Sequence, residues 1–343
     1  MESFQLTEKN YLTSNNFARS SSVVFSEVIS KQEFQKISKK DIKIIYELDN
    51  EICYIKTKFQ LKENDIVFSN TEFINYLFKQ LRKIKNLKNI KLITHWSDQD
   101  IDKIKFQKKP SSISKWYGVH VNYKNDNLIS IPLGLSGNYS SKNLTPKYFN
   151  DSPEKNLWKE KDNLLYINFQ KNTNLKEREE LVNYFNDQNW VKIEEPTLNL
   201  NEYIVNLQNS KFVLCPFGNG FDTHRLWECI YAGTIPIVLE HIAYKNSENL
   251  PVLIVKDFKE INENVLNKKY KKIKDKQYEF EKLNTDYWMN IINEEILDSD
   301  ELFNVNISKL QEKKIIYFYK LNRFKNRFKK IIKFRLNQVK KLI

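Results

Sequence analysis

The residues best placed to do chemistry lie between Ser210 and Leu239. A buried-looking apolar stretch leads into a loop that contains Gly218 and Gly220, and a segment with helical periodicity follows at once. Glycine permits close backbone approach or a positive φ. The unpaired N–H groups at the start of a helix favour an anion such as a pyrophosphate. The pattern therefore predicts an anion site at this loop.

Three polar side chains share one face of the helix expected over residues 223–232. At about 100° per residue, His224, Arg225 and Glu228 lie opposite the apolar stripe. A guanidinium suits phosphate, and a carboxylate accepts hydrogen bonds from both hydroxyls of a ribose. We expect Asp222 or Thr223 to cap the helix. The alternative is an ordinary solvated ion pair on a helix surface.

This stretch resembles the signature of exostosin-like glycosyltransferases. The matching elements are Leu214-Cys-Pro-Phe-Gly218, Arg225-Leu-Trp-Glu228 and Gly233-Thr-Ile-Pro-Ile-Val238. The resemblance implies a GT-B fold and inverting transfer from a nucleotide sugar, usually UDP-linked, with Arg225 on the donor phosphate and Glu228 on the ribose. The donor-binding residues expected in this segment are Gly218, Asn219, Gly220, Asp222, Thr223, His224, Arg225 and Glu228.

A second segment, residues 166–178, looks like the first strand and loop of the same domain. The carboxyl end of that strand would face the same cleft. Asn168, Asn174 and Arg178 could then reach the donor phosphate or sugar. The alternative is an ordinary helix with Asn174 as its N-cap.

Inverting transfer needs a base for the acceptor hydroxyl, and in a GT-B arrangement the N-terminal half would supply it. The turn Thr94-His-Trp-Ser-Asp98 directly follows an expected strand. Asp98 is the first choice for the base and His95 the second. Asp98 could instead cap a helix, and His120 reads better as a core histidine.

We expect no metal and no cofactor other than the nucleotide sugar as co-substrate. Asp98-Gln-Asp100 has the spacing of the metal motif of GT-A enzymes, but it belongs to a different architecture. The cysteines Cys53, Cys215 and Cys229 form no CxxC pair, so a zinc site or a disulfide framework is not expected and a reducing compartment fits best.

Strands separated by helices of about ten residues point to parallel βαβ units. We therefore expect an α/β fold of GT-B type, with two Rossmann-like domains facing a cleft and a basic C-terminal helix. The expected divisions are a polar lead-in (1–40), an acceptor-side domain (41–145), a linker (146–162), a nucleotide-sugar-binding domain (163–310) and the basic amphipathic helix (311–343).

The charge is concentrated at the C-terminus. The chain has 56 Lys and Arg against 43 Asp and Glu. From Lys313 onward there are twelve basic residues and no acid, with apolar residues at helical spacing. This pattern predicts that residues 313–343 form a helix that either lies on an anionic membrane surface or packs back on the N-terminal domain.

The location expected is cytoplasmic and peripherally membrane-associated. The N-terminus lacks the basic and apolar regions of a signal peptide, and no apolar run approaches the ~18 residues that span a bilayer. The expected partners are a nucleotide sugar, a glycan or lipid-linked acceptor, and the membrane. Nucleic acid is not expected. The competing class is a non-catalytic protein with a nucleotide-sugar fold, or a nucleic-acid binder led by the tail.

Overall fold

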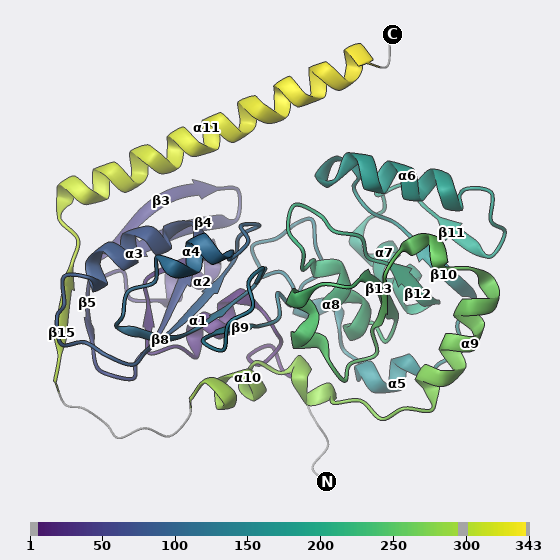
Figure 1. The fold of residues 1–343 in the computed structure, drawn as a ribbon, viewed down its shortest axis with the longest axis horizontal. Coiled ribbons are helices and arrows are strands. Elements are labelled where there is room, and N and C mark those ends of the chain that lie inside the picture. Colours follow the sequence, from purple (N-terminus) through teal and green to yellow (C-terminus); the bar gives the residue numbers. More distant parts are fainter. Residues whose placement is uncertain (1–5, 294–300, 341–343) are drawn as a thin grey trace.

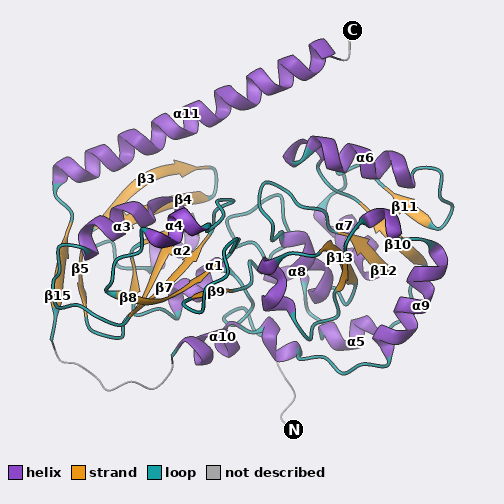
Figure 2. Ribbon diagram, viewed as in Figure 1, coloured by secondary structure: helices purple, strands orange, loops and turns teal. Residues whose placement is uncertain are grey.

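The computed structural model describes residues 6–293 and 301–340, with side chains as far as residue 325. Two five-stranded parallel sheets lie side by side, one in each half of the chain (Figure 1). Helices and loops surround both sheets (Figure 2). The expected α/β class with parallel sheets is confirmed.

The first parallel sheet has the order β1-β6-β7-β8-β9. Its strands are β1 (Val23–Val24), β6 (Ile66–Asn70), β7 (Ile90–His95), β8 (Ile113–Gly118) and β9 (Leu128–Ser130). Every residue of β6 and β7 is buried, as expected for strands covered on both faces. The helices of this half include α3 (Ile74–Leu81) and α4 (Lys103–Gln107).

Two small antiparallel sheets flank the first parallel sheet. One has the order β2-β4-β3, from β2 (Ser26–Ser30), β4 (Glu51–Lys56) and β3 (Ile42–Leu48). The other pairs β5 (Lys58–Leu61) with β15 (Phe303–Asn306). Strands β3 and β4 form a hairpin.

The N-terminal 40 residues are not a loose lead-in. They form α1 (Ser14–Arg19), β1, β2 and α2 (Lys31–Lys36). Leu12, Phe17 and Phe25 are fully buried. The polar residues that look like a loop in the sequence instead support this structure, because Thr13 caps α1 and Ser30 forms a capping box with Glu33 on α2.

The second parallel sheet has the order β11-β10-β12-β13-β14. Its strands are β10 (Asn163–Ile167), β11 (Val191–Ile193), β12 (Ser210–Leu214), β13 (Ile235–Leu239) and β14 (Leu253–Val255). Its helices are α6 (Leu175–Phe185), α7 (Leu200–Gln208), α8 (His224–Tyr231) and α9 (Glu263–Lys274). The strand–helix alternation expected for this half is present.

The expected linker, residues 146–162, is packed rather than extended. It contains α5 (Pro153–Leu157) and a 3₁₀ turn, η2 (Pro146–Tyr148). Gly233, just past α8, has φ +72°, and a Cβ there would lie 2.4 Å from the carbonyl carbon of Asn156. Glycine is therefore required at this position both for its backbone conformation and for the contact with α5.

The chain returns to its first half before residue 310. α10 (Thr285–Ile292) packs on α1, and β15 pairs with β5. The expected second-domain range of 163–310 therefore includes residues that lie against the first half.

A single buried cluster of apolar side chains crosses between the halves, from Phe68 and Ile93 to Leu165 and Val213. The Tyr231 hydroxyl on α8 reinforces this junction: it accepts a hydrogen bond from the backbone N–H of Leu12 and donates one to the carbonyl of Leu283.

The helix α11 (Lys309–Lys340) runs along one side of the molecule and contacts β3 (Figure 1). Ile315 is buried, and Tyr319 stacks on Tyr46 and Phe73. The first turns of α11 therefore pack on the body, the alternative that the sequence left open. Residues 341–343 of the expected basic helix lie outside the described residues. No helix in the described part of the chain combines the length and apolarity needed to cross a membrane.

Candidate functional site

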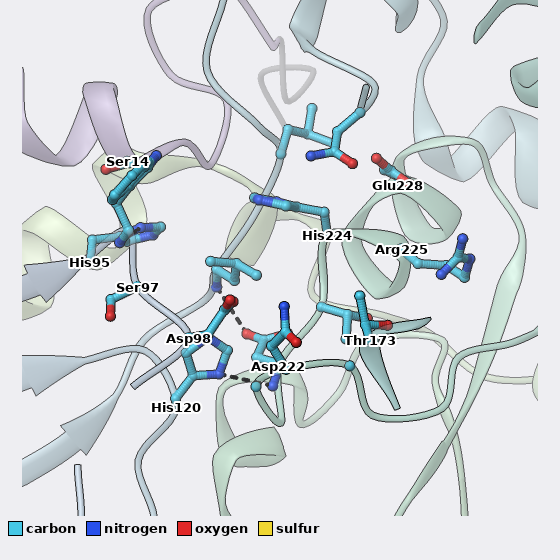
Figure 3. A pocket seen from close by; sticks show the side chains of 18 of the residues that line it. Ser14, His95, Ser97, Asp98, His120, Thr173, Asp222, His224, Arg225 and Glu228 are labelled. Atoms are coloured by element: carbon cyan, nitrogen blue, oxygen red, sulfur yellow. Dashed lines mark hydrogen bonds between the residues drawn. The ribbon is translucent and has the colours of Figure 1, made fainter. Parts of the chain in front are cut away.

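A cavity of about 480 Å³ lies between the two halves. From the first half it is lined by residues that follow β6, β7 and β8, and from the second half by the loops after β10 and β12 and the start of α8. Figure 3 shows side chains from both halves pointing into this space. Ligands bind at the carboxyl ends of strands in open parallel sheets, so this is the candidate site.

The structure brings most of the expected site residues together. The expected residues that line the cavity are His95, Asp98, Arg178, Gly218, Asn219, Gly220, Asp222, Thr223, His224, Arg225 and Glu228. Asn168 and Asn174 do not line it, contrary to expectation. The Asn168 side chain donates to the carbonyl of Glu195, and that of Asn174 donates to Glu177. Both amides are used in local structure next to the cavity wall.

Arg178 holds the glycine-containing loop in place. Its guanidinium donates to three backbone carbonyls: Nε to Phe217 at 3.0 Å, Nη2 to Pro216 at 3.0 Å and Nη1 to Gln170 at 2.7 Å. Burial, and then the nearby charge of Arg225, lower the pKa of Arg178 to about 10. Arg178 thus shapes the loop after β12 and adds positive charge beside the cavity.

Two polar groups at the start of α8 are buried without a hydrogen-bond partner among the described residues. They are Nε of Arg225 and Oγ1 of Thr223. The Arg225 guanidinium lies 5.9 Å from the Phe169 ring centroid, and that of Arg178 lies 5.2 Å from the same ring. An unpaired buried donor costs about 1–3 kcal/mol, so this corner of the cavity fits a bound anion.

Glu228 is 3% exposed and lines the same cavity. Its Oε1 accepts from the backbone N–H of Leu144 at 3.1 Å, and its Oε2 accepts from the Tyr203 hydroxyl at 3.1 Å. Each carboxylate oxygen has a second lone pair. The carboxylate is therefore fixed in position and keeps acceptor capacity toward the cavity.

Of the two residues expected to cap α8, Thr223 occupies the N-cap position, but its side chain makes no capping hydrogen bond. Asp222 is buried, with Oδ2 accepting from the backbone N–H of Leu133 at 2.9 Å and Oδ1 from Trp227 Nε1 at 2.8 Å. Burial raises its pKa to about 7. Asp222 therefore joins the α8 loop to the first half.

His95 is unsuited to act as a base. Its Nδ1 accepts from the backbone N–H of Trp96 at 2.9 Å, so its other nitrogen, Nε2, carries the proton and donates to the carbonyl of Pro132 at 3.2 Å. Burial lowers its pKa to about 3. Because the backbone occupies both nitrogens, the expected role of His95 as the second-choice base is not supported by its geometry.

His120 is buried, as expected for a core histidine, yet it also reaches the cavity wall. Its Nδ1 accepts from the backbone N–H of Asp222 at 3.1 Å, and burial lowers its pKa to about 4. Its ring packs on Gly220, where a Cβ would lie 2.4 Å from His120 Cε1. Glycine is therefore needed at position 220 because the His120 ring lies so close to its backbone, and not because of a positive φ.

His224 has one nitrogen engaged by the backbone. Its Nδ1 lies 2.8 Å from the carbonyl oxygen of Gly134, and because a carbonyl only accepts, Nδ1 donates. The neutral ring then carries a lone pair on Nε2. The side chain lines the cavity, so this nitrogen is available to a ligand.

Two carboxylates mark the first-half side of the cavity. Asp98 is exposed in the turn after β7 and is not a helix cap, because Asp102 caps α4. Glu72 lies in the 3₁₀ turn η1 (Thr71–Phe73). It was not predicted as a site residue, because in the sequence its segment looks only like the start of a helix. Burial, and then the charge of Asp98, raise the pKa of Glu72. Its position directly after β6 was the available signal.

The backbone around this acidic side is unusual. Trp96 and His120 both line the cavity and have φ of +54° and +55°. Non-glycine residues adopt this left-handed region rarely, and it is concentrated at functional sites. Among the described residues, no group of three or more His, Cys, Asp or Glu is arranged to hold a metal ion.

Residues 165–335 match the family described as the RXYLT1 C-terminal domain. The match supports a glycosyltransferase family. It covers just under half of the chain, including the end of β10, the Arg178 segment and α8 with Arg225 and Glu228. The first-half residues of the cavity lie outside it. A search of curated proteins finds no match to this chain.

Proposed function

We propose that this protein transfers a sugar from a nucleotide-sugar donor, with UDP as the expected nucleotide, to an acceptor hydroxyl. The observation that carries the proposal is the pair of unpartnered buried groups, Arg225 Nε and Thr223 Oγ1, at the start of α8 in a cavity between the halves. The match of this segment to a glycosyltransferase-related family supports the same function.

The donor diphosphate would lie at the start of α8. Arg225 would neutralise its charge, and Thr223 together with the first N–H groups of the helix would donate hydrogen bonds. Glu228 would accept from the ribose hydroxyls on the lone pairs that Leu144 and Tyr203 leave unused. Arg178 would act through the loop, whose carbonyls it holds.

Transfer would invert the anomeric centre. Asp98 would take the proton of the acceptor hydroxyl while that oxygen attacks the anomeric carbon from the face opposite the diphosphate. The bond between the anomeric carbon and the phosphate oxygen breaks. The diphosphate leaves with the bonding electrons, and the Arg225 guanidinium neutralises its negative charge. Glu72 would assist, because a second carboxylate nearby favours a shared proton.

The wider proposal is a GT-B-like enzyme that works without a metal, in which the half built on the first parallel sheet binds the acceptor and the half built on the second parallel sheet binds the donor. The acceptor would be a glycan or a lipid-linked glycan, and the protein would face the cytoplasm and bind an anionic membrane through its basic C-terminal helix. Because Ile315 and Tyr319 pack on the body, only the later part of residues 313–343 would meet the membrane.

The test is a thermal-shift titration with UDP and UDP-sugars. At a hundred times Kd a ligand stabilises the folded state by about 2.7 kcal/mol, so a clear rise in melting temperature is expected for the wild type. Arg225→Ala should abolish the shift. Arg82→Ala, an exposed arginine in the first half, is the matched control and should keep it.

Each remaining outcome discriminates between functions. A nucleotide shift with no UDP release across acceptors would favour a non-catalytic nucleotide-sugar-binding protein. If no nucleotide shifted the melting temperature while DNA or RNA bound in a salt-sensitive way, the glycosyltransferase proposal would be refuted.

A further inference from the structure

A second cavity of about 540 Å³ adjoins the first. The two share Glu72 and Trp96 as lining residues. The second cavity lies between the start of α11, the β3–β4 hairpin and the segment that follows β6. We call it the aromatic groove, after its lining residues Tyr46, Tyr76, Trp96 and Tyr319.

The helix α11 supplies one wall of the aromatic groove. Tyr319 stacks between Tyr46, at 5.3 Å and 12° between ring planes, and Phe73, at 5.7 Å and 27°. One turn later the Arg323 guanidinium lies 5.3 Å from the Tyr46 ring centroid. These contacts hold the helix against the first half and fix the aromatic faces before any ligand arrives.

Carboxylates accompany the aromatic rings. Glu51 and Glu72 both line the groove, and Glu51 accepts a hydrogen bond from the Tyr46 hydroxyl. No hydrogen bond to the Glu72 carboxylate is found within the described part of the chain. Against these two acids the groove has one guanidinium, that of Arg323, so it offers poor compensation for a phosphate.

This combination fits a saccharide. Aromatic faces pack against the C–H faces of a flat, largely neutral ring, and carboxylates accept hydrogen bonds from its hydroxyls. The cavity volume is within the range of small-molecule sites, about 300–1,000 Å³. An anionic nucleotide fits the first cavity, where Arg225 and Arg178 lie, and fits the aromatic groove poorly.

We propose that the aromatic groove binds the acceptor, as a chain of one or more neutral sugar units. The acceptor would extend past Trp96, so that its terminal hydroxyl enters the first cavity beside Glu72 and Asp98. This inference rests on the proposed function. It assigns α11 a part in acceptor recognition, as one wall of the groove. Because Tyr319 already stacks on Tyr46 and Phe73, the rings left to contact the acceptor are those of Tyr76 and Trp96.

The test places a large side chain in the groove by substituting an exposed residue of α11. Asn322 is exposed on α11 and lines the groove, whereas Lys320 is exposed on the same helix and does not. Asn322→Trp should block the groove, and Lys320→Trp is the matched control. The probes are UDP, a UDP-sugar and a panel of para-nitrophenyl mono- and disaccharides, with binding read by saturation-transfer NMR.

The wild type and Lys320→Trp should bind at least one saccharide of the panel. Asn322→Trp should weaken that binding by about tenfold or more, because the added indole would occupy the space that the sugar needs; tenfold corresponds to about 1.4 kcal/mol of binding free energy. UDP binding, and the slow release of UDP when water replaces the acceptor, should be the same in all three proteins.

Equal saccharide binding by Asn322→Trp and the wild type would overturn the inference, as would a wild type that binds UDP but no saccharide of the panel. A protein that binds saccharides in the groove but neither UDP nor a UDP-sugar would contradict the proposed function and leave the groove assignment standing. The two failures are therefore distinguishable.

Discussion

Gly220 and His120 form the contact that sets the α8 loop against the first half, and a double-mutant cycle tests it. A Cβ on Gly220 would lie 2.4 Å from His120 Cε1 and 2.7 Å from both ring nitrogens. No rotation of a methyl group relieves such an overlap, so either the ring or the loop must move. Moving the ring breaks the hydrogen bond from the Asp222 N–H to Nδ1.

The expected magnitudes differ between the two backgrounds. In the wild type, Gly220→Ala should lower the free energy of unfolding by about 1–3 kcal/mol, the usual cost of overpacking. In His120→Ala the ring is gone. Gly220 has no positive φ, so the added methyl should then be neutral or should stabilise by about 0.4–1 kcal/mol through the unfolded chain. The coupling energy should therefore be about 2 kcal/mol.

Urea unfolding of the wild type, both single variants and the double variant measures this coupling. The denaturant dependence should be the same for all four, so that midpoints can be compared directly. His120→Ala alone should be destabilised by about 1–3 kcal/mol, because the buried Asp222 N–H loses its acceptor. If Gly220→Ala costs the same in both backgrounds, the ring does not rest on this glycine and the reasoning is wrong.

Three further predictions concern the cavity. Asp98→Asn should lower the rate of transfer by about 10²–10⁴-fold with UDP binding unchanged, as measured by UDP release and calorimetry; an equal rate would move the base role to Glu72. Arg178→Lys should weaken UDP binding without unfolding the protein, because an ammonium cannot reach three carbonyls in the fork geometry of a guanidinium; unchanged affinity would contradict a loop-positioning role. Asp222 has a pKa raised to about 7 from 3.8, so the folded state binds its proton more tightly than the unfolded state. Its contribution to stability should be complete below about pH 4 and lost as the pH rises through about 7, by at most about 1.4 kcal/mol per pH unit; Asp222→Asn should flatten the pH profile of unfolding over that range, and parallel profiles would refute the assignment.

The second-half wall of the cavity could be predicted from the sequence because its signals are local. The strand, the glycine-containing loop after it and the helical periodicity that follows place Gly218, Arg225 and Glu228 within about ten residues of the chain. The second parallel sheet followed from the same alternation.

The remainder depended on contacts between distant residues. Glu72 looks like part of a helix start, and only the parallel pairing of β6 with β7 brings it beside the turn that holds Asp98. His95 looks like a base until its two backbone partners, Trp96 and Pro132, are known. The N-terminal 40 residues look like a loop because their order comes from capping and from burial against later strands.

The packing between the halves bears on how the cavity works. A buried apolar cluster crosses the junction between the halves. The Asp222 carboxylate, just before α8, and the Tyr231 hydroxyl, at its end, each make a hydrogen bond to the backbone of the first half. Opening the cavity by a hinge would expose apolar surface at about 25 cal/mol per Å² and would break buried hydrogen bonds. A ligand therefore meets a cavity that is largely formed in advance. In the proposed transfer, such preorganisation would hold Arg225 ready for the charge that develops on the leaving group, without reorganisation at the moment of transfer.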